Sequence, residues 1–266
     1  MTSTESKPLA VVTGASSGIG RELAKQLAKN GFDLLVNAED DRLDAAAAEL
    51  RGYGARVRAV RADLRTAEGV EKVYTAVTAL GRPVDVVALN AGVGQGGAFL
   101  DNDLADELDI IDLNITSTVR LAKRILRDMA VRGEGKVLIT SSITATVPGS
   151  CQAVYNASKS FLQSFGAALQ SELKDTRITI TVLTPGPTET DFFRRAGMQG
   201  TKVGASSKDD PARVAEQGFR ALVKGDARVV AGSLGTKAQG VAAALLPDRL
   251  KAAAHRQMAK PGPSSR

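Results

Sequence analysis

The stretch LAVVTGASSGIG, residues 9–20, decides the fold of this 266-residue chain. Its first five residues predict a buried strand, and its three glycines lead into a helix expected at 19–30. Small residues let the backbone turn sharply, and the helix start offers free N–H groups and a positive dipole end to an anion. The spacing Gly-x-x-x-Gly-x-Gly departs from the general Gly-x-Gly-x-x-Gly pattern, and an ordinary strand-to-helix turn is the alternative. We favour a dinucleotide-binding turn, because strand, glycines and helix occur together.

Outward from this turn, short β-branched runs alternate with longer Ala- and Leu-rich segments of helical spacing. Strands are predicted at residues 9–13, 33–37, 56–61, 85–90, 136–141, 178–184 and 228–231. Helices are predicted at residues 19–30, 42–52, 67–80, 105–131, 154–174 and 211–223. Apolar strands joined by helices require βαβ crossovers, which make the strands parallel and cover both faces of the sheet. We therefore predict an α/β fold, a single-domain Rossmann-like doubly wound parallel sheet of about seven strands with helices on both faces.

The chain shows no linker, internal repeat or low-complexity tract, so we expect one domain over residues 1–266. Its core is expected at 7–190. The region 187–210 includes a stretch rich in Gly, Ser and charge, residues 192–207, which we expect to be a mobile substrate loop over the strand ends. The tail 236–260 has helical spacing broken at Pro247, and it either packs on the core or forms a subunit contact.

Composition narrows the classes of function. Apolar residues make up 43% of the chain and charged residues 24%, as in globular proteins. The net charge is +6, but no basic run is longer than a pair, and aromatic residues make up only 4%. We therefore expect no nucleic acid partner, and a basic nucleic-acid binder is a weak alternative. The positive excess fits a solvated surface with some attraction for a phosphorylated ligand.

The chain has one cysteine and one histidine. Cys151 cannot form an internal disulfide, which fits a reducing compartment. With His255 as the one histidine, we expect no metal site. No apolar run approaches the roughly 18 residues of a membrane span, and residues 1–8 are polar. These features predict a cytoplasmic protein without a membrane partner.

Tyr155 and Lys159 open the helix predicted at 154–174, four positions apart and therefore on one helix face. A phenol with a pKa of about 10 exchanges protons poorly at neutral pH unless a cation stabilises its phenolate, and an adjacent ammonium group does so. An exposed pair on a solvated helix is the alternative. Ser141-Ser142 ends the preceding strand, where a ligand is expected, and offers a hydroxyl to a substrate oxygen; a turn or capping role is the alternative there.

Together these residues resemble the short-chain dehydrogenase/reductase family, in its single-domain Tyr-x-x-x-Lys type. The resemblance covers about residues 7–190. It rests on the Thr-Gly-x-x-x-Gly-x-Gly turn at 13–20 and on Asp63-Leu64, Asn90-Ala91-Gly92, Asn114, Ser142, Tyr155, Lys159, Pro185-Gly186, Thr188 and Thr190. The resemblance implies little about the chain after about residue 200.

The resemblance implies an NAD(P)-dependent oxidoreductase that transfers a hydride between a nicotinamide cofactor and a carbonyl or secondary alcohol. In it Tyr155 is the acid and base, and Lys159 holds the cofactor ribose and lowers the pKa of Tyr155. Ser142 binds the substrate oxygen, and Asn114 supports a water linked to Lys159. The cofactor-binding residues so implied are Gly14, Ser16, Ser17, Gly18, Ile19, Gly20, Asn37, Asp63, Leu64, Asn90, Ala91, Gly92, Tyr155, Lys159, Pro185, Gly186, Thr188 and Thr190. A non-catalytic dinucleotide-binding redox sensor is the alternative, and the complete catalytic set argues against it.

The end of the second strand bears on the choice between NAD and NADP. An acidic group there binds the ribose 2′-hydroxyl of NAD, whereas an Arg accepts the 2′-phosphate of NADP. Residues 37–42 read Asn-Ala-Glu-Asp-Asp-Arg. Position 37 therefore lacks the usual Asp, and position 38 lacks an Arg. The acids would repel a phosphate or simply cap the next helix, while Arg21 or Arg42 could reach one. We expect NAD or NADP and lean to NAD.

The expected partner is a small carbonyl or alcohol substrate, neutral and fairly apolar, because the candidate pocket residues are small or apolar. These candidates are Val93, Gly94, Val147, Gly149, Cys151, Phe192, Phe193 and Met198. The resemblance also suggests a homo-oligomer, a dimer or tetramer built partly on the Tyr155 helix. On that helix Phe161, Phe165 and Leu169 follow a helical repeat and belong either to the core or to an interface.

Overall fold

Seven parallel strands form one sheet in the order β3-β2-β1-β4-β5-β6-β7 in the computed structural model, which describes residues 7–260. The strands are β1 (Leu9–Thr13), β2 (Asp33–Ala38), β3 (Val57–Arg61), β4 (Val86–Leu89), β5 (Glu134–Thr140), β6 (Arg177–Pro185) and β7 (Arg228–Ala231). The order reverses between β1 and β4, which are direct neighbours. The predicted doubly wound α/β sheet is therefore confirmed, and its ligand site is expected beside this reversal.

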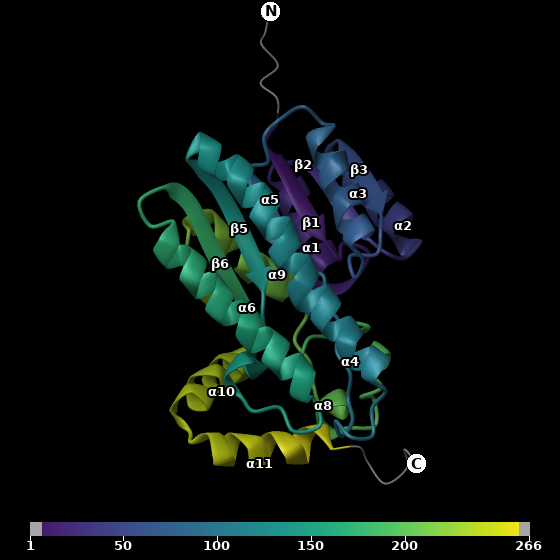
Figure 1. Cartoon of the computed structure of the whole chain (residues 1–266), viewed down its shortest axis with the longest axis vertical. Coiled ribbons are helices and arrows are strands. Elements are labelled where there is room, and N and C mark those ends of the chain that lie inside the picture. The colour runs from purple at the N-terminus through teal and green to yellow at the C-terminus, as the bar shows by residue number, and fades with distance from the viewer. Residues whose placement is uncertain (1–6, 261–266) are drawn as a thin grey trace, which may run out of the picture.

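Helices connect successive strands and continue into the tail (Figure 1). The helices are α1 (Gly18–Lys29), α2 (Arg42–Arg51), α3 (Ala67–Thr78), α4 (Leu104–Ile110), the π-helical turn η1 (Ile111–Thr116), α5 (Ser117–Arg132), the 3-10 turn η2 (Ile143–Thr146), α6 (Ala153–Glu172), α7 (Phe192–Arg195), α8 (Lys202–Ala205), α9 (Pro211–Lys224), α10 (Leu234–Leu245) and α11 (Asp248–Ala259). Asp210 caps α9 by accepting a hydrogen bond from the Ala212 N–H, as the sequence suggested.

Alternate residues of the strands supply two cores, one on each face of the sheet. Ala10 and Val12 of β1 pack with α1, α2 and α9, while Leu9 and Val11 pack with α3, α5 and α6. All five residues of β1 are buried, as a parallel strand covered on both faces requires. The carboxyl ends of the strands are left free of these layers, and the site lies there.

Two details of the secondary structure were not predicted. The helix expected at 105–131 is present as α4, η1 and α5 in unbroken succession, and its middle turn, η1, is π-helical. Residues 192–207, expected to be a mobile loop, contain the short helices α7 and α8. The Thr201 side chain caps α8 by accepting a hydrogen bond from the Gly204 N–H. The mobility of this region stays a prediction.

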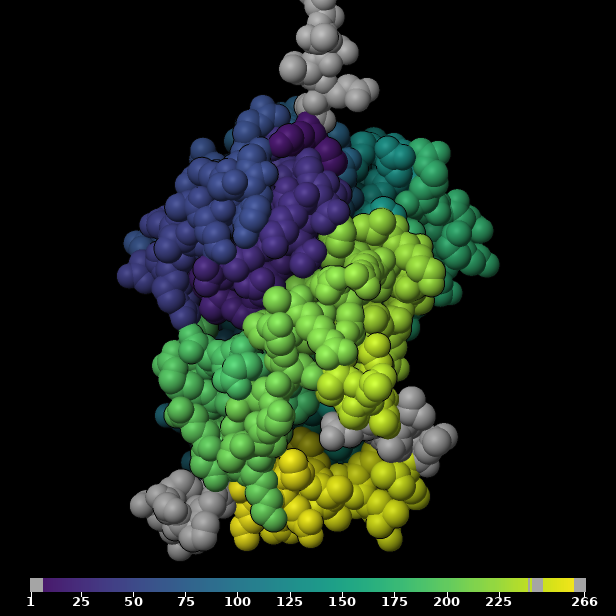
Figure 2. All heavy atoms as spheres, turned by 180° about the vertical axis from the view of Figure 1, so that it is seen from behind, coloured from purple at the N-terminus to yellow at the C-terminus, as the bar shows by residue number. Residues whose placement is uncertain are grey.

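The tail forms two helices separated at Pro247, as predicted. Figure 1 shows α10 and α11 below the carboxyl ends of the strands, and α11 contacts α8. Seen from behind, the green segment around residue 200 lies between the purple and blue N-terminal half and the yellow tail (Figure 2). Within residues 7–260, no helix combines the length and the apolar character needed to cross a bilayer.

Candidate active site

A cavity of about 1040 Å³ runs along the carboxyl edge of the sheet. Every predicted cofactor-binding residue lines it, from Gly14 in the first turn to Thr190 after β6. Ser142, Tyr155 and Lys159 line the same cavity, so the structure brings these predicted catalytic residues together with the glycine-rich turn. Asn114 alone among the predicted site residues is absent from the wall, because it is fully buried behind it.

The glycine-rich turn leaves room for a dinucleotide close to the backbone. Gly14 and Gly18 have φ values of +67° and +54°, which residues with a Cβ adopt rarely. A Cβ on Gly20 would overlap the Gly14 carbonyl oxygen and lie 2.5 Å from Asn90 Nδ2. The turn therefore depends on all three glycines, and it presents the start of the twelve-residue helix α1 to the cavity. These features fit a bound pyrophosphate.

Hydroxyl and amide groups fix the strand ends around the turn. The Thr13 hydroxyl oxygen accepts hydrogen bonds from the Asn90 and Ala91 N–H groups, at 2.9 and 3.0 Å. The Asn90 side chain donates to the Thr13 carbonyl oxygen and accepts from the Thr140 hydroxyl. Three neighbouring strands, β1, β4 and β5, are thereby held in register at the cavity edge.

Ser142, Tyr155 and Lys159 form the catalytic candidate group. The Ser141 hydroxyl donates to the Lys159 carbonyl oxygen at 2.8 Å and ties the end of β5 to α6. The Ser142 hydroxyl oxygen accepts hydrogen bonds from the N–H and hydroxyl of Thr144, so it also fills the capping role that sequence left open. Lys159 Nζ lies 5.7 Å from the centroid of the Tyr155 ring and donates to the Thr140 carbonyl oxygen at 3.1 Å.

Burial dominates the protonation of this pair. It raises the pKa of Tyr155 to about 12, and a hydrogen bond with Ser142 opposes the rise. It lowers the pKa of Lys159 to about 8. Burial is the larger of these two effects on Tyr155, because removing a phenolate from water is costly, and the expected lowering of the Tyr155 pKa by Lys159 stays a prediction. Tyr155 carries its proton at neutral pH.

Asn114 lies on the π-helical turn η1 and makes three hydrogen bonds. Its side chain accepts from the Val93 N–H and donates to the Val93 carbonyl oxygen, both at 2.9 Å. It also donates to the Ser158 hydroxyl. A Cβ on Gly92 would lie 3.1 Å from Asn114 Oδ1 and 3.2 Å from Lys159 Nζ, so the two side chains approach each other behind Gly92.

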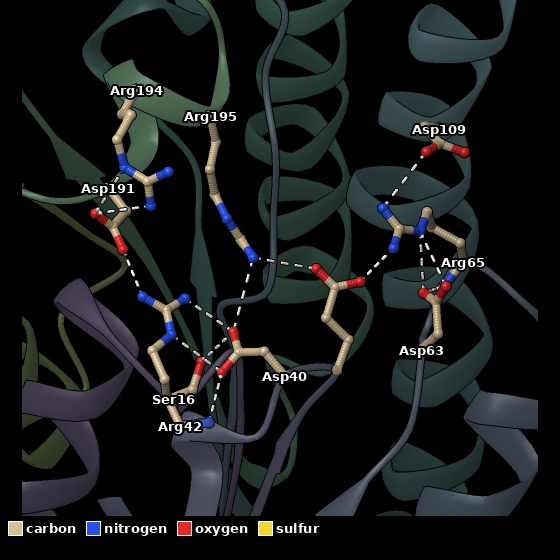
Figure 3. A network of polar contacts seen from close by, with 10 residues as sticks. Ser16, Asp40, Arg42, Asp63, Arg65, Asp109, Asp191, Arg194 and Arg195 are labelled. Atoms are coloured by element: carbon tan, nitrogen blue, oxygen red, sulfur yellow. Dashed lines mark hydrogen bonds and ion pairs between the residues drawn. The ribbon is translucent and has the colours of Figure 1, made fainter.

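Acidic and basic residues alternate at the other end of the cavity, beyond β2 (Figure 3). Arg42 pairs with Asp40 at 2.9 Å and with Asp191 at 2.5 Å. Arg42 is therefore already engaged by two carboxylates. Arg21 pairs instead with Glu49 on α2.

Arg65 and Arg195 both pair with Glu39, from opposite sides. The Ser16 hydroxyl donates to Asp40, and Arg42 holds the pKa of Asp40 below its usual range. Asn37 donates its side-chain N–H groups to the Val60 and Ala62 carbonyl oxygens. The Asn37 amide N–H groups are therefore occupied by the protein itself, while Glu39 and Asp40 line this end of the cavity with Arg195 beside them.

The pocket beside Tyr155 is partly as predicted. Val93, Gly94, Val147, Phe192 and Phe193 line the cavity. Three other candidates do not line it. Gly149 packs against the Asn156 side chain, Met198 is fully buried, and Cys151 packs with Met198 and Phe193 in a separate cluster.

Sequence reasoning missed the contribution of α11 to this pocket. Lys251, Ala254, His255 and Met258 line the cavity from the tail. His255 Nδ1 lies 3.0 Å from the Ser150 carbonyl oxygen, and burial lowers the pKa of His255. The spacing of these residues at one helix face was visible in the sequence, but nothing there indicated which surface the tail covers.

Comparisons with known proteins agree with this geometry. A family model described as short chain dehydrogenase matches residues 8–199. A putative ketoacyl reductase of Streptomyces coelicolor is 36% identical over 192 residues, 70% of this chain and 73% of that protein. A short-chain dehydrogenase of Sphingobium yanoikuyae, solved in complex with NADPH, has a TM-score of 0.79 at 27% identity and covers 97% of this chain and 98% of its own. A Burkholderia phymatum relative solved with NAD, at 23% identity, covers 85% and 89% with a TM-score of 0.77 and shows the fold alone.

The fold and the site define a nicotinamide-dependent oxidoreductase. The chain belongs to the short-chain dehydrogenase/reductase family. It is an NAD(P)-dependent enzyme that acts on CH–OH groups, and these findings give no support to a non-catalytic redox sensor.

Proposed function

We propose that the protein interconverts a carbonyl compound and a secondary alcohol, with Tyr155 as the acid and base. The observation that carries the proposal is the meeting of Ser142, Tyr155 and Lys159 in the cavity that begins at the glycine-rich turn. When bound in this cavity, the nicotinamide cofactor supplies or accepts the hydride. The side chains of the protein must then hold the substrate oxygen and move one proton.

Each of the three side chains has a distinct task in carbonyl reduction. The Ser142 hydroxyl accepts hydrogen bonds from Thr144 and keeps its own proton to donate to the substrate oxygen. Tyr155 gives its phenolic proton to that oxygen as the carbonyl carbon gains a hydride. The ammonium group of Lys159 stabilises the phenolate that remains. In alcohol oxidation the proton returns to Tyr155.

Asn114 is proposed to support proton supply to Lys159 through a water. Its approach to Lys159 behind Gly92 favours this role. Its hydrogen bonds to Val93 hold the chain that follows β4, so the same side chain also shapes the cavity wall.

NAD is the proposed cofactor. Arg42, Arg65 and Arg195 each have a carboxylate partner, and Glu39 and Asp40 line the end of the cavity. A 2′-phosphate placed there would have to compete with these carboxylates for the arginines. The two solved relatives differ in the cofactor they contain, so this preference rests on the charges of the present chain.

The proposed substrate is neutral and fairly apolar. Phe192, Phe193, Val147 and Val93 surround the space near Tyr155. Two of the cations that line the cavity are already engaged. Lys251 is held by Asp248 and the Thr146 carbonyl oxygen, and Lys208 lies over the Phe193 ring and pairs with Glu189. A carboxylate substrate would therefore find no free cation at Lys251.

A homo-oligomer is proposed with α4 and α6 at its interface. Leu104, Leu108 and Ile111 are exposed on α4 and η1, and Phe161 is exposed on the adjacent α6. Phe165 and Leu169 are partly buried and pack against the core, which favours the core position for these two residues. A cytoplasmic location stays a prediction.

Removing one hydroxyl tests the proposed function. Tyr155→Phe should lower turnover of a carbonyl panel at least about a hundredfold, since it removes the proton donor, while leaving the cofactor Kd within about twofold. Tyr53→Phe, which removes a phenol on an exposed ring outside the cavity, serves as the control. Undiminished turnover by Tyr155→Phe would refute the assignment. Running the panel with NADH and NADPH in parallel tests the cofactor preference.

A further inference from the structure

The short helix α7 forms the wall beside the proposed proton donor. The ring of Phe192 lies 5.1 Å from the Tyr155 ring, and its plane is tilted by 49° to that ring. Gly94 makes this approach possible, since a Cβ there would lie 2.6 Å from Phe192 Cζ. The position of α7 therefore sets how much space remains next to the phenol.

The same helix is tied to the far end of the cavity by charged side chains (Figure 3). Asp191, directly before α7, pairs with Arg42 at the start of α2, at 2.5 Å. Arg195, its last residue, lies 3.3 Å from Glu39 and 3.7 Å from Asp40, the two acids that follow β2. One helical turn thus carries ion pairs at both ends and Phe192 between them.

We propose that Asp191 and Arg195 are positioning residues, which hold α7 and its residue Phe192 against Tyr155. The charged residues at the adenosine end of the cavity thereby fix the position of the substrate-binding wall at the nicotinamide end. This inference rests on the proposed function, because that function places the substrate between Phe192 and Tyr155.

Three observations favour ion pairs as the source of this positioning. A four-residue helix cannot maintain itself, since helix formation needs a longer run of hydrogen bonds. Phe192 is only partly buried, although Phe193 on the same turn is buried. Arg42 also keeps the pKa of Asp191 below its usual range, so the carboxylate stays charged at neutral pH.

Both ion pairs are partly exposed, with side-chain exposures of 38% for Arg195 and 32% for Glu39, and of 40% for Arg42 and 36% for Asp191. Each pair is consequently weak and sensitive to salt. The inference therefore predicts that high salt reproduces the effect of removing Arg195, which distinguishes a charge-held helix from one held by packing.

Hydrogen exchange of the peptide containing α7 tests the proposal without turnover. The N–H groups of Arg195, Ala196 and Met198 donate to backbone oxygens within this segment, so their exchange reports its opening. In low salt, Arg195→Ala should speed this exchange about fivefold, and Arg195→Lys should restore most of the protection. In the wild-type protein, 0.5 M NaCl should speed the exchange at least as much, because salt also weakens the Asp191–Arg42 pair, and it should speed exchange less in Arg195→Ala than in the wild type.

Arg194→Ala is the matched control, because Arg194 is the neighbouring exposed arginine and pairs with Asp191 without touching Glu39 or Asp40. It should leave the exchange unchanged. With a substrate from the panel, Arg195→Ala should raise KM by more than it lowers kcat. Equal exchange in Arg195→Ala and Arg194→Ala would overturn the inference, even if Tyr155→Phe is inactive. If Tyr155→Phe stays active, the proposed function fails, while the exchange data still decide whether the ion pairs hold α7.

Discussion

The Lys159 ammonium nitrogen lies 5.7 Å from the centroid of the Tyr155 ring, and both side chains are buried at the end of one cavity. Burial opposes charge on either group. The phenol of Tyr155 therefore stays neutral, and Lys159 loses its proton at a lower pH than an exposed lysine does. Proton donation from Tyr155 leaves a phenolate, which a protonated Lys159 stabilises.

The rate of carbonyl reduction should therefore fall as the pH rises through about 8, where Lys159 loses its proton. Below that pH the ammonium group is present, and Tyr155, with a pKa of about 12, remains protonated throughout. The measurement is kcat against pH from 6 to 10 at saturating cofactor, with cofactor Kd followed in parallel. A rate that stays level up to pH 10 would contradict the assigned role of Lys159.

Ser142→Ala should lower kcat/KM for reduction about a hundredfold, because it removes a hydrogen bond to the oxygen that gains negative charge. Steady-state kinetics with the panel substrate measures the loss. Ser150→Ala is the control, since that nearby serine does not line the cavity. Equal kinetics for the two variants would exclude Ser142 from substrate binding.

Asp40→Asn should raise the affinity for NADPH relative to NADH about tenfold, because it removes a charge at the proposed ribose site and releases Arg42 and Arg195 from one partner. Titration of both reduced cofactors gives the ratio. Asp41→Asn removes an exposed charge outside the cavity and should leave the ratio unchanged. A ratio that moves equally in both variants would assign the effect to net charge.

Asn114→Ala should reduce the free energy of unfolding by about 2–4 kcal/mol, because it leaves the Val93 N–H and carbonyl groups without their partner in a buried place. Urea unfolding followed by circular dichroism measures the change. Asn30→Ala, at an exposed helix end, should cost much less. Comparable losses would mean that the π-helical turn does not depend on Asn114.

The sheet could be predicted because its strands are apolar on both faces, as β1 illustrates. The glycine-rich turn and the Tyr155–Lys159 spacing are local patterns, so the sequence also located the two ends of the cavity. The π-helical turn escaped prediction because residues 104–116 have an unbroken helical pattern. The turn accompanies contacts between Asn114 and Val93, which are distant along the chain.

The ion pairs around Glu39 could not be predicted for a related reason. Arg195 is 156 residues from Glu39 in sequence, and only the folded sheet brings them together. The acids alone suggested repulsion of a phosphate, whereas the structure supplies each of Glu39 and Asp40 with arginine partners. Long-range charge pairing depends on tertiary geometry that residue types do not encode.

The outer wall of the pocket is built by the final helix, α11, whereas Ser142, Tyr155, Lys159 and the glycine-rich turn all precede residue 187. Exchange of a terminal helix interrupts no strand and breaks no crossover. Substitutions on α11 would therefore change substrate choice while the reaction machinery stays intact. Because the pocket wall and the catalytic residues lie on different parts of the chain, α11 can be redesigned for a new substrate selectivity without changing the catalytic residues.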